Sequence, residues 1–235
     1  THLAKEYNAA LPNSTAIAAV ICSGPGEKPS GQESFEEVLA GSASTPPPAQ
    51  VIPSDLAALI YTSGTTGNPK GVMQTHQSMV FASGSLIEYL RLEPDDRILC
   101  VLPMAFDYGL YQLLMTIRLG ATLVLERSFT YPAQIFARMR EQGVTVFPGV
   151  PTVYAMMISA HGRSPLQFPD VRRVTKTAAA LPDEFVVRLR EIFPNALIYR
   201  MYGLTECKRV SYLEPELADQ MPGCVGKAIP GTEVY

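Results

Sequence analysis

The chain contains no tryptophan, only three histidines, and four scattered cysteines: Cys22, Cys100, Cys207 and Cys224. The cysteines form no CxxC pair and no Cys/His cluster with zinc-ligand spacing, which argues against a structural zinc site. No segment approaches the roughly twenty uninterrupted apolar residues of a membrane span, and no basic stretch precedes an apolar signal core. These absences predict a reduced, cytoplasmic protein without a membrane span.

Positive charge is also scarce. The net charge is −3, charged residues make up 17% of the chain, and no Lys/Arg-rich run occurs. This argues against a general nucleic-acid binder. We interpret the pairs Arg172-Arg173 and Lys208-Arg209 as solvated surface. With 235 residues, 47% of them hydrophobic, the chain is long enough for a sizeable core in one or two domains.

The most informative segment is YTSGTTGNPKG at residues 61–71. Its glycines allow amide N–H groups to approach an anion, its hydroxyls add donors, and Lys70 supplies a cation. The preceding run, Asp55 to Tyr61, is expected to be a buried strand. The segment therefore predicts a phosphate-binding loop.

It lacks the GxxxxGK[ST] pattern, because Pro69 precedes Lys70 and Gly71 follows it, which argues against an ordinary GTPase or kinase loop. The alternative is a flexible turn.

A second segment, YGLTE at residues 202–206, strengthens this interpretation. Together the two segments resemble the signature loop and the YGxTE motif of the AMP-forming adenylating superfamily, which includes acyl-CoA synthetases, peptide synthetase adenylation domains and luciferases. Between them, TAAAL at residues 177–181 lies where that family usually has a glycine-containing strand end that contacts adenine. The alanines are a departure from that pattern.

The resemblance implies an α/β fold with parallel βαβ units, as in the large domain of acyl-CoA synthetases, here incomplete. Residues 1–50 would be the trailing end of an upstream subdomain with a Pro/Ser-rich connector at 41–50. Residues 51–235 would be the central ATP-binding subdomain, and the family's C-terminal lid domain, with its catalytic lysine, would be absent. Such a piece would bind ATP weakly and turn over poorly.

Strands and helices alternate along residues 51–235, which independently predicts parallel βαβ units. We expect helices at Thr75–Leu90, Leu110–Leu119, Pro132–Gly143, Pro151–Ala160 and Pro182–Phe193, and strands at 97–102, 121–125, 144–147, 171–175 and 197–201. Before the connector, Ala16–Cys22 is a candidate strand and Glu33–Leu39 a candidate helix. Because ligands collect at the carboxyl ends of parallel strands, both motifs are expected to converge on one crevice.

The implied reaction joins a carboxylate to ATP, giving an acyl-adenylate and pyrophosphate, after which a thiol of coenzyme A or of a carrier protein takes the acyl group. Lys70, Thr205 and Glu206 are the implied catalytic residues. The nucleotide would contact Thr62, Ser63, Gly64, Thr65, Thr66, Gly67, Lys70, Ala178, Ala179, Ala180, Tyr202, Gly203 and Thr205.

Magnesium would be bound by Glu206, with Thr66 as a further contributor. The alternative for Glu206 is a surface salt bridge with Lys208 or Arg209. Tyr202 would stack on adenine, and its alternative is a packed core tyrosine.

The acid substrate would contact His76, Phe106, Asp107 and Tyr108, with His76 lining its site. Many acyl-CoA synthetases have a histidine where this chain has Phe106, whereas amino-acid-activating domains have Phe-Asp, whose aspartate pairs with the substrate ammonium. Asp107 therefore leaves fatty or aryl acids and amino acids both open. It is also a suitable carboxylate for a helix N-terminus.

We expect an acyl-CoA ligase, since Leu204 is typical of acyl-CoA synthetases. An amino-acid adenylation domain is the first alternative, and a non-catalytic nucleotide-binding module is the second.

Overall fold

The computed structural model describes residues 19–24, 31–46, 48–63, 67–177, 179 and 182–235. The chain divides into two compact units, Thr1–Gln50 and Val51–Tyr235. In the described part of the first unit, β1 (Ile21–Cys22) pairs in parallel with β2 (Glu33–Ser34), and α2 (Phe35–Gly41) follows. Ser34 caps this helix by accepting a hydrogen bond from the Glu37 amide, so the helix begins later than Glu33.

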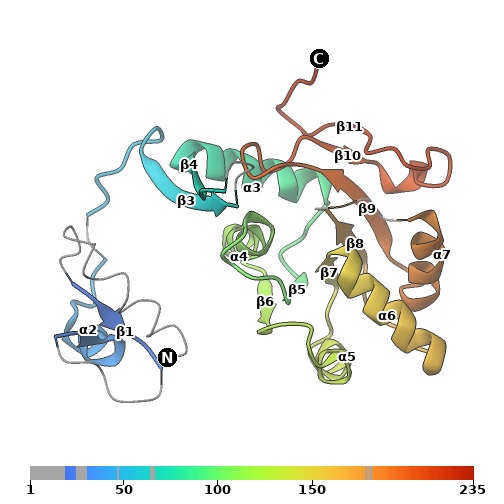
Figure 1. Cartoon of the computed structure of the whole chain (residues 1–235), viewed down its shortest axis with the longest axis horizontal. Helices are drawn as coiled ribbons and strands as arrows, with labels where there is room; N and C mark the ends of the chain where they lie inside the picture. Colours follow the sequence, from blue (N-terminus) through green and yellow to red (C-terminus); the bar gives the residue numbers. More distant parts are fainter. Residues whose placement is uncertain (1–18, 25–30, 47, 64–66, 178, 180–181) are drawn as a thin grey trace. The chain divides into compact units, whose positions relative to one another are not determined.

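The second unit is built on a seven-stranded sheet with the order β11-β10-β9-β8-β7-β5-β6 (Figure 1). Neighbouring strands from β6 to β9 pair in parallel, whereas β10 pairs antiparallel with both β9 and β11. The strands are β5 (Arg97–Cys100), β6 (Thr122–Leu125), β7 (Val146–Gly149), β8 (Arg173–Lys176), β9 (Leu197–Tyr202), β10 (Ser211–Leu213) and β11 (Lys227–Ala228).

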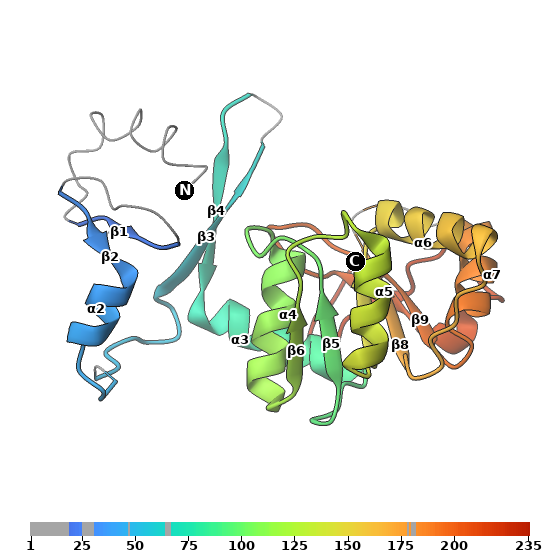
Figure 2. The same cartoon turned by 90° about the horizontal axis from the view of Figure 1, so that it is seen from below.

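Helices cover both faces of this sheet (Figure 2). They are α3 (His76–Tyr89), α4 (Asp107–Leu119), α5 (Pro132–Glu141), α6 (Pro151–Arg163) and α7 (Asp183–Ile192), with a short 3₁₀ turn, η2 (Pro215–Leu217). The chain runs outward from β5 to β6 and then back across β5 to β7, so right-handed crossovers place α4 on one face and α5 to α7 on the other.

Each face has its own core. One contains Val153, Val174, Val186 and Leu189, and the other contains Leu86, Cys100, Tyr111 and Tyr199. The alternating helices and strands expected within residues 76–202 are confirmed, with ends shifted by a few residues. The largest shifts are at α4, which begins at Asp107 rather than Leu110, and at α6, which ends at Arg163 rather than Ala160.

The expected buried strand before the phosphate loop is different in the structure. β3 (Leu56–Thr62) belongs to a separate two-stranded antiparallel sheet with β4 (Lys70–Thr75), and Leu56, Leu59 and Tyr61 are about half exposed. β3 and β4 thus pair as the two strands of a hairpin and do not belong to the parallel sheet. An apolar run of this length does not reveal whether its partner strand is parallel or antiparallel.

The chain leaves this hairpin through a well-capped helix. Thr75 ends β4, and its hydroxyl accepts a hydrogen bond from the Ser78 amide at 3.1 Å. This is the N-cap that the sequence predicts, because a threonine side chain can satisfy one of the free amides at a helix start. The cap fixes the direction of α3 relative to the hairpin.

The interpretation of Arg172-Arg173 as solvated surface is wrong for Arg173, which is 7% exposed. Both guanidinium groups bind the fully buried Asp96, at 2.7 Å from Arg172 and 3.0 Å from Arg173. Asp96 also accepts hydrogen bonds from the Thr145 hydroxyl and the Glu93 amide. This network joins the starts of β5, β7 and β8, opposite the edge where the strands end.

Replacement of Asp96 by alanine should destabilise the fold by about 3–5 kcal/mol, because it leaves Arg173 charged, buried and without its main partner. Urea unfolding followed by circular dichroism measures the change. Asp95→Ala is the matched control, since Asp95 is 71% exposed and binds only Arg172. The control should cost under about 1 kcal/mol. Equal costs for both variants would contradict a buried network centred on Asp96.

Candidate functional site

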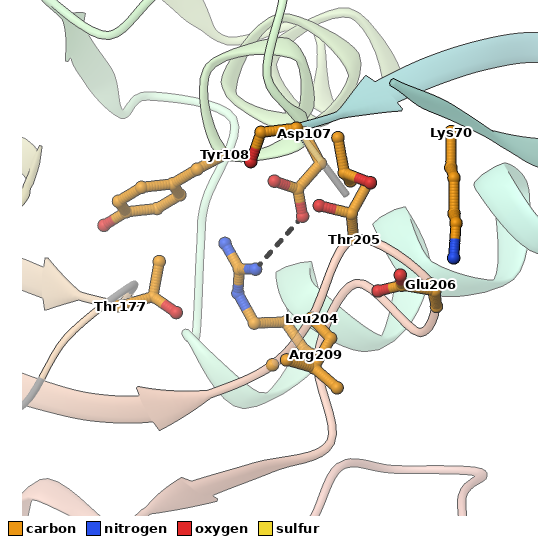
Figure 3. A pocket seen from close by; sticks show the side chains of 11 residues that line it. Lys70, Asp107, Tyr108, Thr177, Leu204, Thr205, Glu206 and Arg209 are labelled. Atoms are coloured by element: carbon orange, nitrogen blue, oxygen red, sulfur yellow. Dashed lines mark hydrogen bonds and ion pairs between the residues drawn. The ribbon is translucent and has the colours of Figure 1, made fainter. Parts of the chain in front are cut away.

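A cavity of about 530 Å³ opens at the carboxyl edge of the sheet (Figure 3). It is lined by four parts of the chain that are distant in sequence: the β3–β4 hairpin, the start of α4, the segment after β8, and the loop after β9. The lining residues are Thr62, Ser63, Lys70, Asp107, Tyr108, Thr177, Gly203, Leu204, Thr205, Glu206 and Arg209. Lys70 and Glu206 therefore border one cavity, as the sequence predicts for the two motifs.

One side-chain hydrogen bond joins the hairpin to the loop after β9. Gln74 on β4 is fully buried, and its Nε2 donates to the backbone carbonyl of Thr205 at 3.3 Å. The amide orientation follows from this contact, because the reversed orientation would place two acceptor oxygens together. The Oε1 atom of Gln74 is buried without a hydrogen-bond partner. The strand carrying Lys70 is thus coupled directly to the loop carrying Glu206.

The loop between β9 and β10 folds back on itself within a few residues. A Cβ atom at Gly203 would clash with the carbonyl oxygen of Lys208, so only glycine allows this approach. Lys208 has a φ of 56°, the left-handed region that residues with a side chain rarely adopt. This tight return places Thr205, Glu206 and Arg209 along the cavity, with Lys208 and Arg209 buried.

Lys208 and Arg209 are each 5% exposed, so the interpretation of this pair as solvated surface is wrong. Burial lowers the pKa of the Lys208 ammonium, partly offset by the negative charge of Asp107. The Arg209 guanidinium lies over the Tyr108 ring at 4.9 Å from its centroid and 3.5 Å from the Asp107 carboxylate. Figure 3 shows this guanidinium pointing toward Asp107 across the cavity.

Tyr108 forms a rigid wall of the cavity. Its hydroxyl donates to the carbonyl of Thr175 at 2.7 Å and lies 2.8 Å from the Thr175 hydroxyl. Burial raises its pKa to about 12, so the phenol remains neutral at physiological pH. Tyr154 of α6 donates to the same carbonyl at 2.7 Å. The end of β8, which precedes Thr177, is therefore fixed from both faces of the sheet.

Eight of the predicted site residues line this cavity: Thr62, Ser63, Lys70, Asp107, Tyr108, Gly203, Thr205 and Glu206. Gly67 and Ala179 are exposed and are absent from its lining, and Tyr202 is 47% exposed, which contradicts the packed-core alternative. Phe106 is 58% exposed and does not line the cavity. The predicted residues Gly64, Thr65, Thr66, Ala178 and Ala180 lie outside the described residues.

His76 lines a different cavity, of about 550 Å³, between α3 and α4. Its neighbours there include Met79, Leu114 and Ile117, which are apolar. Asp107 and Tyr108 are not among the residues lining that cavity. The structure thus separates His76 from the other residues predicted to contact the acid.

Three lining residues were missed by the sequence interpretation: Thr177, Leu204 and Arg209. Leu204 and Thr177 lie within or beside quoted motifs, so their positions alone could have suggested them. Arg209 gave no such signal, because a charged pair near a motif usually marks a solvated surface. Its burial depends on the path of the chain into β10, which the sequence pattern did not predict.

Glu206 is exposed, and in the described part of the chain it forms no ion pair with Lys208 or Arg209, in contrast to the salt-bridge alternative. The same described ranges contain no group of three or more His, Cys, Asp or Glu residues positioned to hold a metal ion. They also contain no helix with the length and hydrophobicity needed to span a membrane.

The curated proteins most similar in sequence that we compared are named as coenzyme A ligases. The chain is 34% identical to 4-coumarate-CoA ligase 1 of Narcissus pseudonarcissus over 177 residues, which cover 73% of this chain and 32% of that protein. The chain thus spans about a third of the length of this relative.

Among solved structures, VinN in complex with L-aspartate has a TM-score of 0.75 and 38% identity, covering 85% of this chain and 50% of VinN. Another VinN structure contains 3-methylaspartate, with a TM-score of 0.72, 34% identity, and coverage of 87% and 54%. An o-succinylbenzoate coenzyme A synthetase (MenE) from Bacillus subtilis, with ATP and a magnesium ion, has a TM-score of 0.71, 27% identity, and coverage of 83% and 40%. The expected acyl-CoA synthetase-like α/β fold is confirmed.

The family model described as "AMP-binding enzyme" matches residues 2–235, which is almost the whole chain. With the two motifs lining one cavity of the matching fold, this match establishes that the chain belongs to the AMP-binding enzyme family of AMP-forming ligases.

Proposed function

We propose that this chain is the nucleotide-binding part of an enzyme that activates a carboxylic acid with ATP and transfers the acyl group to the thiol of coenzyme A. The observation that carries the proposal is the shared cavity of Lys70, Thr205 and Glu206. Residues 51–235 would form the ATP-binding subdomain. The names of the 4-coumarate-CoA ligase relatives support the acid and the thiol acceptor as classes.

In this proposal, Lys70 holds the β- and γ-phosphates and Thr205 donates to the α-phosphate. Attack of the carboxylate on the α-phosphate concentrates negative charge on phosphate oxygens, so positioned cations and donors stabilise the transition state. Thr62 and Ser63 line the same cavity and add hydroxyl donors beside Lys70. The half-exposed Tyr202 ring offers a face on which adenine can stack.

Magnesium fits the donor set of this cavity. Mg²⁺ is usually held by one or two carboxylates, together with substrate phosphates and water, rather than by a cage of protein ligands. Glu206 provides one such exposed, unpaired carboxylate beside the proposed phosphate site. Glu206 would hold the ion, with Thr66 as a further contributor, and the ion would neutralise part of the phosphate charge. The MenE structure with ATP and a magnesium ion supports the use of magnesium together with ATP.

Amino-acid activation is the second candidate function, and Asp107 favours it. Asp107 lines the cavity with its side chain 15% exposed, and one Arg209 nitrogen lies 3.5 Å from it. This is a long contact for a charge-assisted hydrogen bond, so the carboxylate can accept a further cationic partner. A substrate ammonium is such a partner. Both VinN ligands, L-aspartate and 3-methylaspartate, carry one.

Lys70→Ala should weaken binding of ATP and pyrophosphate by about tenfold and weaken AMP binding much less, because only the first two present phosphates beyond the α-position. Titration calorimetry with each ligand measures the difference. Lys227→Ala is the control, since Lys227 is an exposed lysine of β11. An equal loss for ATP and AMP would place Lys70 away from the β- and γ-phosphates.

Asp107→Asn should distinguish the two candidate functions, because it removes a charge with little change of shape. If the substrate is an amino acid, exchange of pyrophosphate into ATP should fall by at least about 100-fold with L-aspartate, reflecting the lost charged hydrogen bond. Exchange supported by 4-coumarate should change little. The assay is run on the whole protein with both acids. Retained exchange with L-aspartate would rule out Asp107 as the ammonium partner.

Gln74→Leu should weaken Mg-ATP binding by about tenfold without large loss of stability. The change removes the hydrogen bond to Thr205, but it also removes a buried oxygen that has no partner, and these effects on stability oppose each other. Calorimetry and thermal unfolding are measured on the same samples. Met73→Leu is the control, because Met73 is 72% exposed on the same strand. Unchanged Mg-ATP affinity in Gln74→Leu would show that the loop does not depend on this contact.

A further inference from the structure

A second, smaller cavity of about 210 Å³ adjoins the site at the Thr205–Arg209 loop. Helix α3 provides one wall, the loop provides another, and the segment after β11 closes it. The lining residues are Ser78, Phe81, Ala82, Glu206, Cys207, Lys208, Arg209, Val210, Ile229 and Thr232. Glu206 and Arg209 also line the main cavity, so the two spaces meet at these residues.

Lys208 is the unusual member of this lining. It is 5% exposed, and within the described ranges its ammonium has no hydrogen bond and no carboxylate within ion-pair distance. Asp107, whose charge acts on Lys208, pairs with Arg209 instead. Partial removal from water disfavours a charge that has no partner, and a ligand of opposite charge compensates it.

The backbone holds Lys208 in this position. Among the described residues, Lys208 and Arg91 are the two non-glycine residues with positive φ. Arg91 lies at the surface, where it forms ion pairs with Glu214 and Glu216. Lys208 adopts the same strained conformation without such a partner. Strained residues in loops often serve a binding role, and this cationic residue lines the smaller cavity.

The rest of the lining leaves few other roles for this space. Phe81, Ala82, Val210 and Ile229 are apolar, and the Ser78 hydroxyl already donates to the Thr75 carbonyl. Arg209 adds a second cation at the border with the main cavity, and its Nε atom is buried without a partner. Glu206 is the one carboxylate in this lining, and it is exposed beside the proposed magnesium position.

We propose that this cavity is a subsite for a second carboxylate on the acid substrate, bound by Lys208 with Arg209 at its entrance. The proposal rests on the proposed acid-activating function, because the second carboxylate belongs to the same acid whose first carboxylate is activated. The cavity is too small for a nucleotide, since typical small-molecule sites occupy about 300–1,000 Å³, and Lys70 is not part of it. The enzyme would therefore select short dicarboxylic acids over monocarboxylic acids of equal length.

Titration calorimetry with succinate and butyrate, in the presence of saturating AMP, tests this selection. The two acids share a four-carbon chain and differ in one carboxylate. Wild type should bind succinate at least about tenfold more tightly, as expected for a charge-assisted hydrogen bond in a buried site. Lys208→Met keeps the length of the side chain and should remove this difference, with butyrate affinity unchanged. Equal affinity of wild type for both acids would overturn the proposal.

Two further measurements make the assignment specific. Lys227→Met, at an exposed lysine outside both cavities, should retain the preference for succinate. If Lys208→Met also retains it, Lys208 does not bind the carboxylate and the assignment is wrong. Butyrate binding is also measured with acetate present, to test whether a free carboxylate can occupy the subsite. If acetate raises the affinity for butyrate to that for succinate, the subsite binds a free anion, which contradicts its assignment to a carboxylate of the substrate.

The binding of AMP itself separates this proposal from the proposed function. Lys208→Met should bind AMP and Mg-ATP as wild type does, because Lys208 does not line the cavity of the proposed nucleotide residues. Failure of wild type to bind either nucleotide would contradict the acid-activating function. Normal nucleotide binding without a preference for succinate would contradict the dicarboxylate subsite alone.

Discussion

The arrangement of this site depends on one close backbone approach, between Gly203 and the carbonyl of Lys208. Because β10 returns antiparallel beside β9, the chain must reverse within the residues that separate these strands. Glycine at position 203 and the left-handed backbone at position 208 make that reversal possible. The consequence is that Thr205, Glu206 and Arg209 border the main cavity, whereas Lys208 lines only the smaller one.

The cavity also requires that the β3–β4 hairpin, which is outside the main sheet, lies beside the loop after β9. The parallel strands bring Asp107, Thr177 and Thr205 to one edge, as expected for ligands at strand ends where the strand order reverses. Lys70 arrives by another route, on a mostly exposed antiparallel strand. Gln74 connects the two parts, since it lies on the Lys70 strand and donates to the Thr205 carbonyl. In our account, binding of a triphosphate requires both parts.

The alternation of helices and strands was predictable from the sequence, because hydrophobic periodicity and helix caps such as Thr75 are local properties. The hairpin was not predictable in the same way. An apolar run such as Leu56 to Tyr61 fits a central parallel strand and an exposed hairpin strand equally well, and only the pairing with β4 distinguishes them.

That Lys70 and Glu206 line one cavity was likewise predictable, whereas the presence of Arg209 in its lining was not. Its burial arises from the reversal at Gly203 and from packing against Tyr108, a residue about a hundred positions earlier. His76 differs in the opposite way, since its position beside a motif predicted that it lies with Asp107, and the structure places it in another cavity. Contacts between distant segments decide both cases, and a local sequence pattern carries little information about them.

The central claim is that the hairpin and the loop after β9 bind the same triphosphate and its metal ion. Paramagnetic relaxation by Mn²⁺, added with ATP in place of Mg²⁺, tests this most directly in an NMR spectrum of the chain. The account predicts that the amide signals of Lys70 and Gly71 and those of Thr205 to Cys207 broaden together when Mn-ATP is added. Broadening of only one of these two groups, at saturating nucleotide, would contradict it.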